Sequence, residues 1–139
     1  MAVALIILAA GQGTRMNSDL PKVMHRVAGA PLLVHAMHAG WSLEPERIIV
    51  VAGHGAELVE KAARAHDETA EIALQDQQLG TGHAVAQALP LLQDFDGRVI
   101  VLFGDTPFIR PETLERLRDS AADVTVLGFH AADPDHYGR

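Results

Sequence analysis

Two glycines, an arginine and a lysine near the start of the chain have the residue types and the spacing of a loop that binds phosphate. They follow an apolar run and stand at Gly11, Gly13, Arg15 and Lys22, with Pro21 beside the lysine. Glycine can adopt a positive φ and has no Cβ, so backbone N–H groups can approach an anion closely. Arginine offers a planar fork of donors for phosphate oxygens, and lysine offers a mobile point charge. The stretch therefore predicts a phosphate-binding loop at the carboxyl end of a buried strand.

Two other phosphate-binding motifs fit this stretch less well. Met16 and Asn17 occupy the region where the third glycine of the dinucleotide fingerprint would fall, and the stretch has no Gly-Lys-Ser/Thr for a P-loop. On residue types alone, a plain glycine-rich turn that joins a strand to the next element stays open as the alternative.

A second loop of similar character follows a short predicted strand that ends at Gln75. Gly80 and Gly82 again permit close approach of the backbone to a ligand. Thr81 is the expected N-cap of a helix that runs to about Leu89, and the start of a helix offers free N–H groups to an anion. A simple strand–loop–helix connection is the alternative interpretation.

Asp105 is the residue best placed to ligate a metal ion. It closely follows a predicted buried strand over 98–103, and Gly104 leaves space beside it. Carboxylate oxygens are the ligands that Mg²⁺ prefers, so Mg²⁺ is the expected cofactor. The alternative is an aspartate that caps the turn at Thr106-Pro107.

The histidines are weaker candidates for chemistry. His35 and His38 lie three positions apart on a predicted helix, but no third ligand of suitable spacing accompanies them. Solvated or hydrogen-bonded side chains are therefore the preferred interpretation. His54 stands between two glycines after a predicted strand, where a role in the turn is preferred.

Strands and helices alternate along the chain with short connections. Apolar, β-branched runs predict strands, helical spacing of apolar residues predicts helices, and Phe108 and Ile109 are expected to point inward. The predicted strands cover 5–10, 47–52, 71–75, 98–103 and 123–129, and the predicted helices cover 31–42, 57–66, 81–89 and a segment from 111 onward. This alternation predicts an α/β fold, with a Rossmann-like, mostly parallel sheet, helices on both faces, and the informative loops at one edge.

Length and composition limit the class of protein. The 139 residues are one domain's length, and 48% apolar residues can fill a core. A net charge of −7 with 11 dispersed basic residues argues against a protein that holds long nucleic acid. The absence of cysteine excludes disulfides and thiolate zinc sites, and the apolar run over 3–10 is too short to span a bilayer. We therefore expect one cytoplasmic domain over 1–139, with neither nucleic acid nor membrane as a partner.

The first loop resembles the signature loop of sugar-nucleotide pyrophosphorylases. The resemblance rests on residues 8–16, Leu-Ala-Ala-Gly-x-Gly-Thr-Arg-Met, and on residues 21–25, Pro-Lys-Val-Met-His. Residues 74–84, Leu-Gln-x-x-Gln-Leu-Gly-Thr-Gly-His-Ala, match the same family. Within the MobA-like nucleotidyltransferase superfamily, the whole chain is most similar to the N-terminal pyrophosphorylase domain of the bacterial bifunctional N-acetylglucosamine-1-phosphate uridyltransferases. Shorter matches to the first loop occur in other members, such as the molybdenum-cofactor guanylyltransferases.

The resemblance implies a role for each matching residue. Arg15 and Lys22 would hold the triphosphate and, with Asp105 as the Mg²⁺ ligand, would form the catalytic set, while Gln75 would read the base. Phe103 departs from the pattern, since the best-known relatives carry tyrosine there, and any hydrogen bond from that hydroxyl is lost. The residues that would contact the nucleotide or the sugar are Leu8, Ala9, Ala10, Gly11, Gly13, Lys22, Gln75, Gly80, Thr81, Phe103, Gly104, Asp105 and Gly138.

The activity implied by the resemblance is transfer of a uridylyl group. An oxygen of N-acetylglucosamine-1-phosphate attacks the α-phosphorus of UTP, pyrophosphate leaves, and UDP-N-acetylglucosamine forms for peptidoglycan synthesis and cell wall biogenesis. Two alternatives remain open. One is another nucleotidyltransferase of the superfamily, a guanylyl- or cytidylyltransferase, and the other is a module that binds nucleotide without turnover.

The resemblance further implies that the domain is incomplete at its C-terminal end. Related domains continue beyond the Tyr-Gly-Arg turn with a glutamate and asparagines for the sugar and the metal. They often add a β-helix acetyltransferase domain, through which full-length relatives mainly oligomerise. The implied fold is thus a C-terminally incomplete nucleotide-diphospho-sugar transferase fold. The 139 residues alone are expected to bind uridine nucleotide weakly and to turn over no sugar phosphate.

Overall fold

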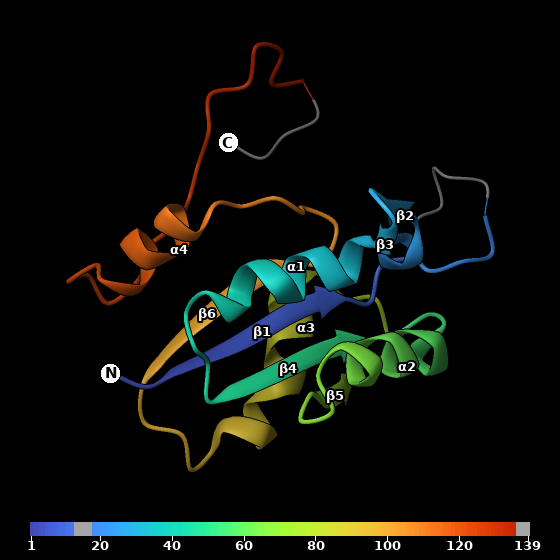
Figure 1. Ribbon diagram of the computed structural model, residues 1–139, viewed down its shortest axis with the longest axis horizontal. Coiled ribbons are helices and arrows are strands. Elements are labelled where there is room, and N and C mark those ends of the chain that lie inside the picture. The colour runs from blue at the N-terminus through green and yellow to red at the C-terminus, as the bar shows by residue number, and fades with distance from the viewer. Residues whose placement is uncertain (13–17, 136–139) are drawn as a thin grey trace.

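A four-stranded parallel sheet forms the centre of the molecule (Figure 1). The computed structural model describes residues 1–12 and 18–135. The strands are β1 (Val3–Ala9), β4 (Arg47–Ala52), β5 (Glu71–Leu74) and β6 (Arg98–Phe103), and they lie in the order β5-β4-β1-β6. Each neighbouring pair in this sheet is parallel. The predicted α/β fold with a parallel sheet is therefore confirmed.

β1 and β4 form the centre of the core because both of their faces are covered. Ile6 of β1 lies beside Ile49 of β4 on one side and Val101 of β6 on the other. Ile6 is 1% exposed and Ile49 is 0% exposed. Continuous apolar runs are typical of parallel strands that are buried on both faces, which is why the sequence pattern located these two strands correctly.

Helices cover both faces of the sheet, as predicted. α1 (Leu32–Trp41), α2 (Ala56–His66) and α4 (Pro111–Arg118) pack on one face. α3 (Thr81–Ala88) packs on the other face and continues into a 3₁₀ turn over Leu89–Leu92. Figure 1 shows α1 in front of β1 and α3 behind the sheet. Among the helices of the described ranges, none is long and apolar enough to cross a membrane.

Two local features near the helix starts differ from the sequence expectation. β2 (Arg26–Val27) and β3 (Ala30–Pro31) pair as a short antiparallel ribbon, which the mixed sequence before α1 did not indicate. α3 begins at Thr81, and the N-cap position belongs to Gly80, whose φ is +104°. The prediction of a threonine cap was wrong, because the chain turns there through a conformation that suits glycine.

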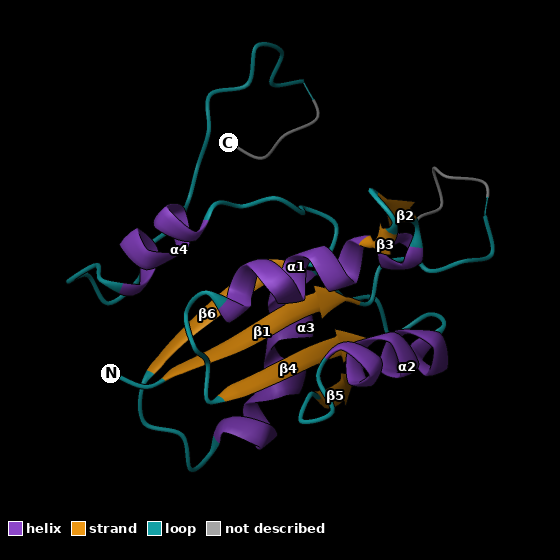
Figure 2. Cartoon of the chain, in the orientation of Figure 1, coloured by secondary structure: helices purple, strands orange, loops and turns teal. Residues whose placement is uncertain are grey.

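The predicted fifth strand over 123–129 is wrong. These residues follow α4 as a loop that runs away from the sheet (Figure 2). Val124 and Val126 are 80% and 84% exposed. The alternating apolar residues fit a strand, but a strand forms only when a neighbour exchanges backbone hydrogen bonds with it. None of the described strands pairs with this segment.

β6 is buried on one face only, whereas the sequence indicated a fully buried strand. Ile100 and Leu102 pack in the core beneath α1 and α4, while Val99, Val101 and Phe103 are exposed. α3 packs against β1, β4 and β5, so it leaves the second face of β6 open. Only alternate apolar residues of β6 therefore lie in the core.

Phe108 does not point inward as expected. Its side chain is 60% exposed, and its ring lies against that of His35 with the centroids 4.9 Å apart. Its backbone has a φ of +68°, which turns the chain after β6. Ile109 does pack against the core, as predicted.

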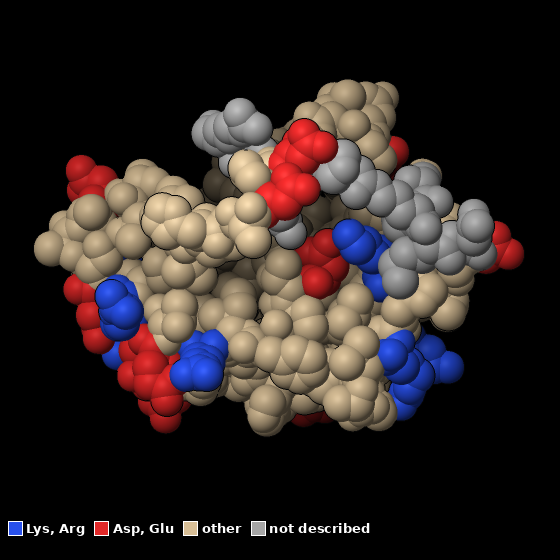
Figure 3. Space-filling model, turned by 90° about the horizontal axis from the view of Figure 1, so that it is seen from above, with Lys and Arg blue, Asp and Glu red and all other residues tan. Residues whose placement is uncertain are grey.

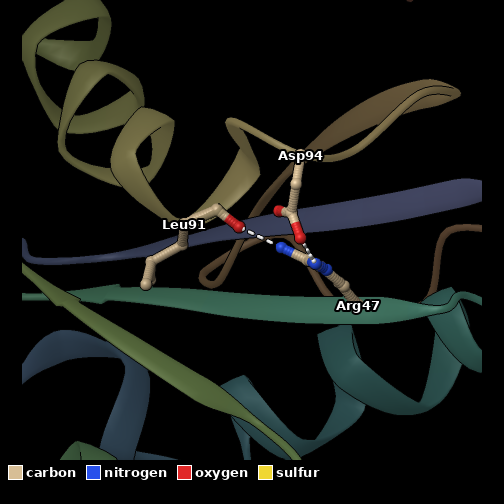
Figure 4. A network of polar contacts seen from close by, with 3 residues as sticks. All are labelled: Arg47, Leu91 and Asp94. Carbon is tan, nitrogen blue, oxygen red and sulfur yellow. Dashed lines mark hydrogen bonds and ion pairs between the residues drawn. The ribbon is translucent and has the colours of Figure 1, made fainter.

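Arg47 ties the start of β4 to the segment after α3 (Figure 4). Its guanidinium donates to the backbone oxygen of Leu91, and Nη2 lies 2.9 Å from Asp94 Oδ2. The hydrogen bond from Arg47 lowers the pKa of the Asp94 carboxyl. Because Asp94 is 77% exposed, the ion pair itself adds little stability. The bond to the Leu91 carbonyl matters more, since it holds the chain between α3 and β6 against the sheet.

A cluster of rings joins the ends of α1 and α2. The indole of Trp41 stacks on His66 with ring centroids 4.4 Å apart, and the ring of His38 lies 6.2 Å from that of His66. The Nε2 atom of His66 is buried without a hydrogen-bond partner in the part of the chain that the structure describes. Burial, and to a lesser extent the nearby His38, lowers the pKa of His66.

The depressed pKa of His66 predicts a loss of stability in mild acid. The unfolded chain takes up a proton near the ordinary histidine pKa of about 6.5, at which the folded chain still resists protonation. The contribution to stability is therefore present above that pH and lost as the pH falls below it. Urea unfolding at about pH 7.5 and about pH 5.5 measures the difference, which His66→Gln should reduce. His130→Gln, at an exposed position, is the control. An unchanged pH dependence in His66→Gln would contradict the prediction.

Candidate active site

The order of the strands reverses at β1, and this reversal creates the natural place for a ligand. After β1 the chain adds β4 and then β5 on one side, and it then crosses over to add β6 on the other side of β1. In such folds ligands bind beyond the carboxyl ends of the strands at the reversal. The carboxyl ends of β1 and β6 and the loops that follow them flank that point, and they carry the candidate residues at 8–11 and 104–105.

Lys22 and Asp105 meet at this point as an ion pair. Lys22 Nζ lies 2.7 Å from Asp105 Oδ2, and the two side chains are 44% and 29% exposed. Two separate motifs predicted that the lysine binds phosphate and that the aspartate binds a metal ion. The fold brings these two side chains together. The turn after β6 is closed by Thr106, whose Oγ1 donates to the Phe103 carbonyl at 3.1 Å. The Asp105 carboxylate instead contacts the lysine.

Gly104 brings the end of β6 close to the end of β1. Its N–H donates to the Leu8 carbonyl at 2.9 Å. A Cβ at this position would lie 2.8 Å from that carbonyl oxygen and 2.9 Å from Val23 Cγ1. Real side chains do not pack this closely, so only glycine allows the approach. The approach places Asp105 directly beside the loop that follows β1.

The segment that carries Lys22 is fastened to the turn between β4 and α2. Pro21 is fully buried, and it packs so closely over Gly55 that a Cβ on this glycine would overlap the proline ring. Gly55 also has a φ of +65°. The ring of His54 hydrogen-bonds through Nε2 to the Asp19 carbonyl at 3.2 Å. These contacts fix the backbone next to Lys22, and they give His54 the structural role that was preferred for it.

The second glycine loop lies against the first. Gln78 Nε2 donates to the Ala10 carbonyl at 2.9 Å, which links the loop after β5 to the loop after β1. Gly53, at the end of β4, lies between them. A Cβ there would lie 3.0 Å from the Gln75 carbonyl oxygen and 3.1 Å from Ala10 Cβ. The fold therefore gathers the candidate loops into one surface.

Gln75 is the buried polar side chain of this surface. It is 3% exposed, and its Nε2 atom donates to the Gly80 carbonyl at 3.2 Å and lies 2.9 Å from His83 Nδ1. Thr81 is exposed at the start of α3. Gln78 and His83 were given no role from the sequence, although Gln78 lies in the second loop and His83 lies on the first turn of α3. Polar side chains that follow a predicted strand were the available signal.

The remaining predicted residues differ in how the structure places them. Gly11 is exposed, has no positive φ, and has open space where a Cβ would be, so packing does not require glycine there. Phe103 is 47% exposed and lies beside Leu8 in the sheet register. Gly13, Arg15 and Gly138 lie outside the described residues.

Asp105 fits a magnesium ion that is held mainly by phosphate and water. Mg²⁺ usually takes one or two protein carboxylates and completes its shell with substrate phosphates and water. Over residues 1–12 and 18–135, no three His, Cys, Asp or Glu side chains gather as a metal site. The partly exposed carboxylate beside an open loop meets the smaller requirement. His35 hydrogen-bonds to the Val27 carbonyl at 2.5 Å, in line with the interpretation preferred over a histidine metal pair.

Among the described residues, basic side chains form no continuous stripe on the face seen in Figure 3. Lys and Arg lie there in separate groups, several of which lie close to Asp or Glu.

Comparisons with known proteins agree with the fold. The profile of the MobA-like NTP transferase domain matches residues 5–137. The bifunctional protein GlmU of Cereibacter sphaeroides is 70% identical over 139 residues, which are 99% of this chain and 31% of that protein. GlmU of Roseobacter denitrificans is 64% identical over 141 residues, with 100% of this chain and 31% of that protein covered. The chain thus spans about a third of the length of the curated relatives it matches.

Solved structures show the same fold at lower identity. A UDP-glucose pyrophosphorylase complexed with UDP-glucose superposes with a TM-score of 0.69 at 21% identity, over 86% of this chain and 54% of that one. Rv0371c of Mycobacterium tuberculosis, in complex with manganese, superposes with a TM-score of 0.68 at 19% identity, over 84% of this chain and 58% of that one. At these identities the likeness establishes the fold.

Proposed function

Because this chain belongs to the MobA-like NTP transferase family, we propose that it is the nucleotide-binding part of a uridyltransferase. The reaction joins UTP and N-acetylglucosamine-1-phosphate into UDP-N-acetylglucosamine and releases pyrophosphate. The observation that carries the proposal is the meeting of Lys22 and Asp105, 2.7 Å apart, beside the glycine loop at the strand reversal. The high identity to the GlmU proteins supports the choice of uridine nucleotide and of this sugar phosphate.

In the proposed reaction the protein mainly holds the two reacting phosphates in line and offsets their negative charge. Positioning and electrostatic stabilisation supply most of the rate in such transfers. Lys22 would hold the triphosphate and offset charge on the departing pyrophosphate, together with Arg15. Asp105 would hold Mg²⁺, which when bound lowers the charge on the reacting phosphates. Gln75 would hold the base, and the exposed backbone around Gly11 would pass beside the nucleotide.

In the free protein Lys22 and Asp105 neutralise each other. A nucleotide with its cation offers each of them a new partner, since the lysine gains phosphate and the aspartate gains the cation. We therefore expect the ion pair to part on binding. Mg²⁺ as the cation, the cytoplasm as the location and cell wall synthesis as the use of the product belong to the same proposal and rest on the family resemblance.

The test of the proposed function is a set of titrations of the chain with UTP, CTP, GTP and ATP in the presence of Mg²⁺. Isothermal calorimetry measures each dissociation constant. We expect UTP to bind most tightly, with N-acetylglucosamine-1-phosphate failing to compete for the base pocket. A preference for GTP or CTP would overturn the assignment in favour of another member of the family, and no binding at all would overturn it altogether.

Replacement of Lys22 by Ala is expected to weaken UTP binding. A hydrogen bond to a charged group is worth about 1.5–3 kcal/mol, which corresponds to roughly tenfold to a hundredfold in affinity. The same calorimetric titration measures the change. Lys61→Ala is the matched control, because it removes the same charge from an exposed position on α2. Equal UTP affinity of the Lys22→Ala and Lys61→Ala variants would contradict a phosphate contact at Lys22.

A further inference from the structure

The orientation of the Gln75 amide is fixed by its two neighbours. Its Nε2 atom lies 3.2 Å from the Gly80 carbonyl oxygen, which can only accept a hydrogen bond. The amino group of the amide must therefore face Gly80. The second proton on Nε2 points to His83 Nδ1, 2.9 Å away. Both donors of the amide are then used, and the Oε1 acceptor is the group that remains for a ligand.

His83 can serve this amide in only one neutral form. Nδ1 must be the unprotonated nitrogen in order to accept from Gln75, so the ring proton sits on Nε2. A protonated Nε2 cannot accept from the amide nitrogen of Gln87, 3.3 Å away, so in this form that contact is not a hydrogen bond. Gln87 Nε2 instead donates to the His83 carbonyl at 3.0 Å. Because His83 is on the first turn of α3, the helix holds the ring in place. The position of α3 therefore determines where the His83 ring meets the Gln75 side chain.

We propose that His83 is a positioning residue for base selection. By engaging the second Nε2 proton, it keeps Gln75 Oε1 as an acceptor toward the base. An acceptor favours a base that carries a ring N–H, as uracil does at N3, and disfavours cytosine, whose N3 is itself an acceptor. This inference rests on the proposed function, because it names the part of the site that would distinguish UTP from CTP.

Three substitutions at position 83 distinguish the effect of the hydrogen-bond acceptor from the effect of the size of the ring. His83→Phe keeps a planar ring and removes the acceptor. His83→Asn places an amide oxygen near the position of Nδ1 and can still accept from Gln75. His83→Leu replaces the phenylalanine variant if the larger ring lowers the folded population. His38→Leu is the control, since it removes an exposed histidine from α1, on the opposite face of the sheet.

The readout is the ratio of UTP affinity to CTP affinity, measured by calorimetry on the whole chain. We expect His83→Phe to lower this ratio about tenfold, from the loss of one oriented hydrogen bond. His83→Asn should keep the ratio within about threefold of the unmodified chain. A ratio that is unchanged in both His83→Phe and His83→Leu would overturn the inference. So would equal loss in His83→Asn and His83→Phe, since bulk rather than the acceptor would then matter.

The same measurements separate the two proposals. If the unmodified chain prefers UTP and His83→Phe keeps that preference, the role of His83 is wrong while the uridyltransferase proposal stands. If the unmodified chain does not prefer UTP, the proposed function is wrong, and the inference falls with it.

Discussion

Replacement of Asp105 by Asn is expected to remove most of the effect of Mg²⁺ on UTP binding. Asparagine keeps the shape of the side chain but loses the anionic oxygen that Mg²⁺ prefers. The wild-type chain should bind UTP more tightly in Mg²⁺ than in EDTA, by roughly tenfold to a hundredfold if the charged contact is worth about 1.5–3 kcal/mol. In the variant, the two affinities should approach each other. Calorimetric titrations in Mg²⁺ and in EDTA measure both values.

The ion pair with Lys22 adds a second expectation for the same variant. Without metal, Asp105 competes with phosphate for the Lys22 ammonium, from which its Oδ2 lies 2.7 Å away. In EDTA, the variant should therefore bind UTP at least as tightly as the wild-type chain. Asp119→Asn is the control, because it removes a carboxylate that pairs with Arg118 at the end of α4. The fold should survive, since partly exposed pairs contribute little stability. Unfolding of Asp105→Asn would show that the residue is structural.

Replacement of Gly104 by Ala is expected to destabilise the fold and to disturb the site together. The added Cβ would lie 2.8 Å from the Leu8 carbonyl oxygen, which is backbone and cannot turn aside. Overpacking of this kind typically costs about 1–3 kcal/mol of unfolding free energy. The strain falls on the hydrogen bond from Gly104 N–H to Leu8, so the ends of β1 and β6 should move apart and carry Asp105 away from the loop after β1.

Two measurements on the Gly104→Ala variant test this expectation. Urea unfolding should show the loss of stability, and the Mg²⁺ effect on UTP affinity should fall even under conditions where the variant is folded. Gly128→Ala is the matched control, because a Cβ at Gly128 would meet nothing within 4 Å, the residue has no positive φ, and it lies in the loop after α4. Wild-type stability in Gly104→Ala would show that the approach of the two strands is looser than described.

The sequence was sufficient for the elements that are defined by their own composition. β1 and β4 were located because a strand buried on both faces needs an unbroken apolar run. Lys22 and Asp105 were singled out because their charge suits phosphate and metal. Lys22 lies downstream of Gly11 and Gly13, beside Pro21, and Asp105 directly follows Gly104. The sheet edge that gathers them also follows from the alternation of strands and helices.

Features that depend on a contact with another segment of the chain could not be predicted from the sequence. The segment over 123–129 has the alternation of a strand, but alternation says nothing about whether a neighbouring strand is available. The contact between Lys22 and Asp105 joins two distant motifs, and neither motif carries information about the other. His83 and Gln75 belong to one motif, but their contact depends on how α3 packs against β5. The cap at α3 was misjudged because threonine is a good cap in general, whereas the turn required the glycine before it.

The central position of β1 also sets an order for folding during synthesis. β1 leaves the ribosome before the other strands of this sheet, and β4 can pair with one of its edges early, but β6 begins only at Arg98. Pairings between distant segments form slowly, and an unpaired apolar edge invites association with other chains. The nascent chain thus carries an open edge on its most apolar strand until β6 emerges. Because Gly104 and Asp105 follow β6 directly, the pairing of β6 with β1 also brings the Asp105 carboxylate into the site.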